Sequence, residues 1–138
     1  MTGSFYRVRT DGASRGNPGP AAIGVAIEDA EGREIASHSE AIGTTTNNVA
    51  EYRAVVQGLT MLAGLGASRA EFLLDSELVV RQLNGQYRVK DPKMVVLYGE
   101  VRRLAARLGQ ITFRHVPRHE NERADRLANE ALDRARAD

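Results

Sequence analysis

The chain has 138 residues, of which 42% are hydrophobic and 27% are charged, proportions that exclude a disordered or collagen-like chain. This length suits one domain with its own core, so we expect residues 1–138 to form a single domain. The formal net charge of +1 excludes a protein held to nucleic acid by overall charge alone, and the lack of cysteine excludes disulfides, thiolate metal sites and a cysteine nucleophile.

The first 45 residues predict an antiparallel meander. Alternating apolar and polar residues indicate a strand over 5–11, and we expect two further strands over 23–29 and 33–42. The segment 12–20 is so rich in glycine and proline that we expect a turn there. A short loop at 30–32, with glycine at its end, joins the second strand to the third.

A change of period marks the next two elements. Apolar residues recur at helical spacing over 52–63, with Asn47 or Asn48 as the N-cap and the segment 64–66 as the end. A short apolar run over 70–75 then indicates a fourth strand.

Two helices, a strand and a final helix complete the chain. A helix capped by Ser76 precedes a longer one that begins after Asp91, with proline at its first position. A strand over 111–116 and a loop over 117–121 lead to a helix over 124–135. The order β-β-β-α-β-α-α-β-α predicts an α/β fold. We expect a five-stranded mixed sheet, part antiparallel meander and part parallel strands, flanked by helices.

Four carboxylates occupy positions that suggest a shared site. Asp11 and Asp75 end two predicted strands, and open α/β sheets bind ligands at the carboxyl ends of their strands. Glu51 and Asp125 are predicted on the sheet-facing sides of two helices. Each acid alone is explained equally well as a turn or helix-terminus residue. Together they would repel one another strongly unless cations were present.

A site made of carboxylates, without cysteine or histidine, favours a hard, oxygen-seeking cation. Mg²⁺ is the first expectation and Mn²⁺ the second. A pair of such ions is a common device for in-line displacement at phosphate. The acids therefore point to phosphoryl chemistry.

Four segments of the chain resemble type 1 ribonuclease H. They are residues 10–19, 45–52, 75–77 and 120–128, and they contain all four acids in the family's order. The match spans nearly the whole chain and is to the compact form that lacks a basic protrusion. The resemblance implies a ribonuclease H-like fold and one catalytic domain over 1–138.

The resemblance also implies an activity. It is endonucleolytic hydrolysis of the RNA strand of an RNA–DNA hybrid, leaving 5′-phosphate and 3′-hydroxyl ends. Asp11, Glu51, Asp75 and Asp125 would be the catalytic ligands of two Mg²⁺ ions, or of Mn²⁺, with Asp11 bridging both. Double-stranded RNA stays open as a second substrate.

Four polar residues match positions that contact the hybrid in this family: Asn17, Thr46, Asn47 and Asn48. The three asparagines would meet the minor groove, where 2′-hydroxyls distinguish RNA from DNA. Thr46 would lie near a phosphate of the DNA strand. The alternative for the asparagines is a role in turns or helix caps.

The chain departs from the best-known family members in three places, one of which is Glu77, where a glutamine is common. It has no tryptophan, and the basic residues between the two middle helices are only Arg88, Lys90 and Lys93. We therefore expect weak hybrid binding, because phosphate attraction supplies much of the affinity for nucleic acid. The loop before Asp125 is short. Its His119 is the nearest equivalent of a histidine that assists proton transfer, with Arg118 and Glu122 as competitors.

Two other interpretations stay open. The missing protrusion favours a non-catalytic nucleic-acid-binding domain, although the four retained acids argue against it. An integrase-like or junction-cleaving nuclease is the other, although the Asn47–Asn48 pair argues against it. We further expect a cytoplasmic monomer with no membrane partner, since no apolar run reaches the ~18 residues of a membrane span. The N-terminus also lacks the apolar stretch of a signal peptide.

Overall fold

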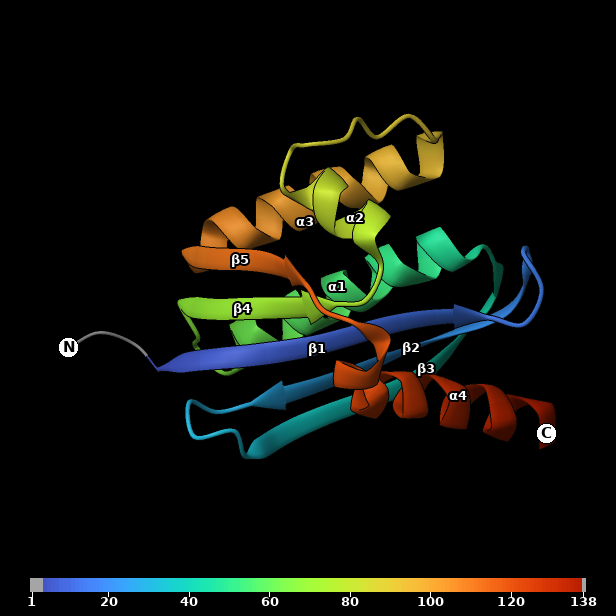
Figure 1. The fold of residues 1–138 in the computed structure, drawn as a ribbon, viewed down its shortest axis with the longest axis horizontal. Helices are drawn as coiled ribbons and strands as arrows, with labels where there is room; N and C mark the ends of the chain where they lie inside the picture. Colours follow the sequence, from blue (N-terminus) through green and yellow to red (C-terminus); the bar gives the residue numbers. More distant parts are fainter. Residues whose placement is uncertain (1–3, 138) are drawn as a thin grey trace.

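The computed structural model describes residues 4–137 and contains one mixed sheet (Figure 1). The strand order is β3-β2-β1-β4-β5. The strands are β1 (Phe5–Ser14), β2 (Gly19–Glu28), β3 (Glu34–Thr45), β4 (Arg69–Leu74) and β5 (Gln110–His115). The first three pair antiparallel, whereas β4 runs parallel to both β1 and β5. The predicted fold class is therefore confirmed.

Helices cover both faces of the sheet. They are α1 (Asn47–Gly64), α2 (Glu77–Leu83), α3 (Pro92–Leu108) and α4 (Glu122–Ala137), and a short 3₁₀ turn, η1 (Arg118–Glu120), precedes α4. α1 packs on β1 and β2 and against α3, while α4 packs on β1, β2 and β3 from the opposite face (Figure 1). Within residues 4–137 no helix has the length and apolar character needed to cross a membrane.

Polar side chains begin three of the helices. Thr46, Ser76 and Asp91 each accept a hydrogen bond from a backbone amide in the first turn of α1, α2 and α3 respectively. The predicted caps Ser76 and Asp91 are confirmed. The N-cap of α1 is Thr46, so the prediction of Asn47 or Asn48 is wrong. The Thr46 hydroxyl already satisfies an otherwise unpaired amide of the first turn.

The first strand is longer than the sequence predicts. Residues 12–14 pair with residues 21–23 of β2, so the irregular segment shrinks from 12–20 to 15–18. Glycine at position 12 serves close packing rather than a turn. A Cβ on Gly12 would lie 2.2 Å from the carbonyl carbon of Ala50 in α1. Asp11 consequently lies inside β1 and not at its end.

The hydrophobic core holds α1 and α4 on either side of β1. The larger cluster fills the space between the sheet and α1–α3 and includes Val8, Tyr52 and Phe72, all fully buried. A smaller cluster of Ala22, Ala131 and Leu132 joins β2 to α4. The two packed layers therefore bring both helices close to the middle of β1, where Asp11 lies.

Candidate active site

The site forms where β1 extends beyond the end of its parallel neighbour, β4. The pairing of β1 with β4 ends at Arg9 with Leu73, and β4 itself ends at Leu74. Beyond that point the edge of β1 meets side chains instead of a strand. The Gly12 amide donates its hydrogen bond to the Glu51 carboxylate of α1. Strand lengths alone thus open a gap in the sheet beside Asp11.

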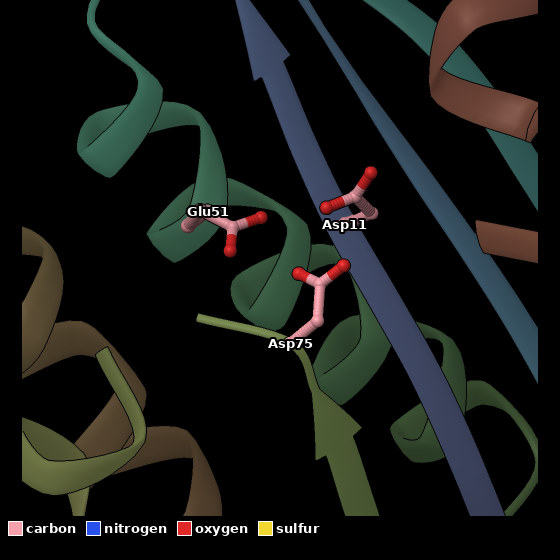
Figure 2. Close-up of side chains that lie close together, drawn as sticks. All are labelled: Asp11, Glu51 and Asp75. Carbon is pink, nitrogen blue, oxygen red and sulfur yellow. The ribbon is translucent and has the colours of Figure 1, made fainter. Parts of the chain in front are cut away.

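Three carboxylates converge on this gap. Asp11 comes from β1, Glu51 from α1 and Asp75 from the residue after β4, and they point toward one another (Figure 2). One oxygen of each lies within 4.8 Å of the others. Asp11 and Glu51 are each only 6% exposed. The structure therefore gathers three of the four predicted acids, which we call the acid triad.

Asp125 lies outside the triad but lines the same cavity of about 560 Å³, which we call the acid cavity. It is half-buried on α4, and its side chain also interacts with Asp11. The approach of α4 depends on Gly24, the β2 partner of Asp11. A Cβ on Gly24 would lie 2.1 Å from the carbonyl oxygen of Ala124. Glycine at this position lets the fourth acid reach the rim of the site.

Burial and mutual repulsion shift the proton affinities of these acids. Burial, followed by the charges of Glu51 and Asp75, raises the pKa of Asp11 to about 10. Burial raises the pKa of Glu51 to about 8 despite the hydrogen bond from Gly12. Burial also raises the pKa of Asp75, and the positive charge of Arg118 partly opposes this. A site that disfavours its own negative charges is suited to a cation.

The donor set fits a hard divalent cation. All the convergent groups are carboxylates, which are the ligands that Mg²⁺ and Mn²⁺ prefer. Two of the acids come from a strand and a helix, and the third directly follows a buried strand, so regular elements fix their positions. The geometry can therefore hold metal next to an open cavity.

Asn121 anchors α4 beside the site and was missed by the sequence reasoning. Its side chain is fully buried, and its Nδ2 donates to the Thr10 carbonyl at 2.9 Å. Its own carbonyl accepts from the Asp125 amide at 3.1 Å. One residue thus ties the start of α4 to the backbone next to Asp11. The only sequence signal is an asparagine just before a predicted helix.

The predicted substrate-binding residues gather at the N-terminus of α1. Asn47 and Asn48 line the acid cavity. The Asn17 Oδ1 accepts from the Asn47 backbone amide at 3.1 Å, which joins the loop 15–18 to α1. Thr46 caps the helix that carries the other two. The four residues therefore form one structural unit beside the acids.

The three candidates for an accessory role lie around Asp125. His119 is 76% exposed, and its Nε2 lies 3.8 Å from Glu120. Together with Arg118, Glu122 and Asp125 it lines an adjoining cavity of about 450 Å³. The predicted loop 117–121 contains η1, which carries Arg118 and His119, whereas Glu122 is the first residue of α4. Of the three, Arg118 lines both cavities.

Two further lining residues, Arg15 and Asn129, were not predicted from the sequence. Asn129 follows Asp125 by four residues, a spacing that places both on one face of a helix. That spacing was the available signal. The sequence offers no such signal for Arg15, because the position of Arg15 depends on how the loop 15–18 folds against α4.

The fold and the acid cavity define an RNase H-like domain. Residues 9–131 match the family model described as reverse transcriptase-like, and the chain belongs to this family. Its near relatives and structural neighbours are type 1 RNase H, which confirms the resemblance noted in the sequence.

Three similar proteins illustrate the relationship. A bifunctional protein of Mycobacterium tuberculosis is 46% identical over 129 residues, which are 93% of this chain and 35% of that protein. Ribonuclease HI of Halobacterium salinarum is 45% identical over 125 residues, 91% of this chain and 63% of that protein. LC11-RNase H1, solved in complex with an RNA/DNA hybrid, superposes with a TM-score of 0.90 at 42% identity, covering 94% of this chain and 98% of that one. The chain thus spans about a third of the mycobacterial protein's length.

Proposed function

We propose that this chain is an endonuclease that hydrolyses the RNA strand of RNA–DNA hybrids and leaves 5′-phosphate and 3′-hydroxyl ends. The observation that carries the proposal is the buried acid triad opening into a cavity lined by the asparagines of α1. The hybrid bound to the similar LC11-RNase H1 supports the choice of substrate.

Asp11, Glu51, Asp75 and Asp125 would hold two Mg²⁺ ions, with Mn²⁺ as the alternative. The all-carboxylate donor set and the raised pKa of Asp11 and Glu51 support this assignment. When bound, such ions activate a water and stabilise charge on the leaving oxygen.

The remaining side chains would bind and orient the hybrid. Asn47 and Asn48 can donate to and accept from 2′-hydroxyls without carrying charge. Asn17 and Thr46 would fix the backbone that presents them, with Thr46 near a DNA phosphate. Arg118 offers a planar guanidinium to phosphate at the mouth of the cavity.

His119 would act as an accessory group. Its exposed imidazole lines the adjoining cavity together with Asp125 and can carry a proton between that cavity and solvent. Its proposed role is smaller than that of the acids, since its side chain is 76% exposed and does not line the acid cavity.

The test is cleavage of an end-labelled RNA–DNA hybrid with Mg²⁺, with Mn²⁺ and with chelator. We expect metal-dependent cleavage of the RNA strand. Asp11→Asn should lower the rate by more than about 100-fold, because even residues behind metal ligands cost 10–100-fold. Glu130→Gln, on an exposed position of α4, should leave the rate unchanged.

Parallel substrates separate the alternatives. Cleavage of duplex DNA but not of the hybrid would indicate an integrase-like or junction-cleaving nuclease. Hybrid binding without metal and without cleavage would indicate a binding domain. A double-stranded RNA substrate in the same series would show whether this second substrate is cut.

A further inference from the structure

Asp125 differs from the other three acids in how it is held. Asp11 and Glu51 are buried, and Asp75, which is half-buried, places one oxygen within 4.8 Å of theirs, whereas Asp125 lies half-buried outside this group and lines the acid cavity. The Asn121 anchor places the backbone of Asp125 but not its carboxylate. A separate contact is needed to orient the side chain.

Asn129 supplies that contact. Its Nδ2 donates to the Asp125 carbonyl at 3.0 Å and to the Asp125 Oδ1 at 3.3 Å. The second bond engages one of the two carboxylate oxygens and so restricts how the Asp125 side chain is oriented.

The Asn129 amide is itself oriented from the other side. Arg15 places its Nη2 3.4 Å from the Asn129 Oδ1 and 2.7 Å from the Asp133 Oδ1. A guanidinium only donates and a carboxylate only accepts. The amide oxygen must therefore face Arg15, and the amide nitrogen must face Asp125. The chain of contacts specifies one of the two orientations of the amide.

Stability does not explain this arrangement. The Arg15 side chain is 38% exposed and that of Asp133 is 68% exposed. Ion pairs this exposed contribute little to folding. These contacts instead determine the direction of the Asp125 carboxylate. They begin at Arg15 in the loop 15–18, which also contains Asn17.

We propose that Asn129 is a positioning residue for Asp125, and that Arg15, held by Asp133, orients the Asn129 amide. The inference rests on the proposed function, in which Asp125 helps to hold metal. It assigns to loop 15–18 a task at the metal site besides its link to α1 through Asn17.

The test compares Mg²⁺ response in four variants: Asn129→Leu, Arg15→Gln, Asp125→Ala and the double variant Asp125→Ala with Asn129→Leu. Asn84→Leu is the control, because the Asn84 amide also donates to a backbone carbonyl, that of Phe113, away from the site. Two quantities are measured: the Mg²⁺ concentration at half of the metal-induced rise in melting temperature, and kcat and KM on the hybrid.

We expect Asn129→Leu to raise the half-effective Mg²⁺ concentration about tenfold and to lower kcat similarly, with KM unchanged. Arg15→Gln should shift the half-effective concentration in the same direction by less, and Asn84→Leu should not shift it. In the Asp125→Ala background, Asn129→Leu should add nothing, since its effect passes through Asp125.

Three results would overturn the inference. One is an Asn129→Leu response equal to that of wild type, another is an equally large effect of Asn129→Leu without Asp125, and the third is a wild-type melting temperature indifferent to Mg²⁺. Loss of the proposed function would look different. Wild type would then leave the hybrid intact while its Mg²⁺ response still depended on Asn129.

Discussion

Asp11 and Glu51 carry carboxylates in places where burial opposes negative charge. Such residues reduce the stability of the metal-free fold, because the unfolded chain ionises them freely. Function explains their presence better than folding does, since each could be replaced by a neutral group of similar shape. The loss of stability that these two carboxylates cause should therefore appear as a pH dependence of the free energy of unfolding.

Asp11→Asn should stabilise the metal-free protein at neutral and mildly alkaline pH. The pKa of Asp11 is raised from 3.8 to about 10 in the folded chain. The stability it contributes is therefore fully present below pH 3.8 and is lost as pH rises toward 10. Asparagine does not titrate, so the advantage of the variant over wild type should grow by up to about 4 kcal/mol between pH 5 and pH 8.

Urea unfolding in chelator at both pH values measures this difference. Glu130→Gln is the control and should follow wild type at each pH. A gap between Asp11→Asn and wild type that stays constant from pH 5 to pH 8 would contradict the prediction.

At the scale of single residues, the sequence identified the acids but not their partners. Asp11, Glu51 and Asp75 could be predicted because each ends or faces a recognisable element. Asn121 and Arg15 could not, because their contacts join segments more than a hundred positions apart. The relative position of such segments depends on packing, which no local pattern encodes.

At the scale of elements, periodicity and caps predicted every strand and the four α-helices, and errors fell at boundaries. The prediction ended the first strand at Asp11 because residues 12–20 are rich in glycine and proline. In the fold, the strand continues through Gly12, and this residue is glycine because α1 passes too close to leave room for a side chain. Glycine at position 12 suggested a turn from the local sequence, but it is required there by tertiary packing against α1.

Gly24 tests whether close approach of α4 to β2 is required. A Cβ there would meet backbone atoms of α4, 2.1 Å from Ala124 and 2.7 Å from Ala128. We expect Gly24→Ala to lower the free energy of unfolding by about 3 kcal/mol, since backbone cannot move aside as a side chain can. Denaturant unfolding at pH 7 measures the change.

Gly99→Ala is the matched control within α3. Apart from its chain neighbours and the backbone of its own helix, nothing lies within 4 Å of the added methyl group, and the position is helical. Alanine there should raise the free energy of unfolding by about 0.5–1 kcal/mol. If both substitutions had the same effect, the close packing of α4 on β2 would not be a determinant of stability.

At the scale of the whole molecule, the acids come from four separate parts of the chain, at residues 11, 51, 75 and 125. They meet only in the folded chain, so the unfolded chain offers no comparable metal site. A ligand that binds only the folded state stabilises it by mass action.

Mg²⁺ should therefore raise the melting temperature, with a stabilisation of about 2.7 kcal/mol at a hundredfold excess over Kd. Chelator should return the melting temperature to that of the metal-free protein. Calorimetric scans with increasing Mg²⁺ measure the effect, with Asp75→Asn as a variant expected to respond less. Equal responses of wild type and Asp75→Asn would argue that the ion binds elsewhere.

Because β4 is shorter than β1, the backbone amide of Gly12 in β1 has a side chain as its hydrogen-bond partner instead of a strand. Because no strand reaches Gly12 on that side, its amide is protected by the Glu51 carboxylate instead. Protection from hydrogen exchange at Gly12 should then depend on a side chain rather than on the sheet. Glu51→Ala should speed exchange at Gly12 while leaving the amides of the β1–β4 ladder slow, so that one resonance reports on how the acid triad is assembled.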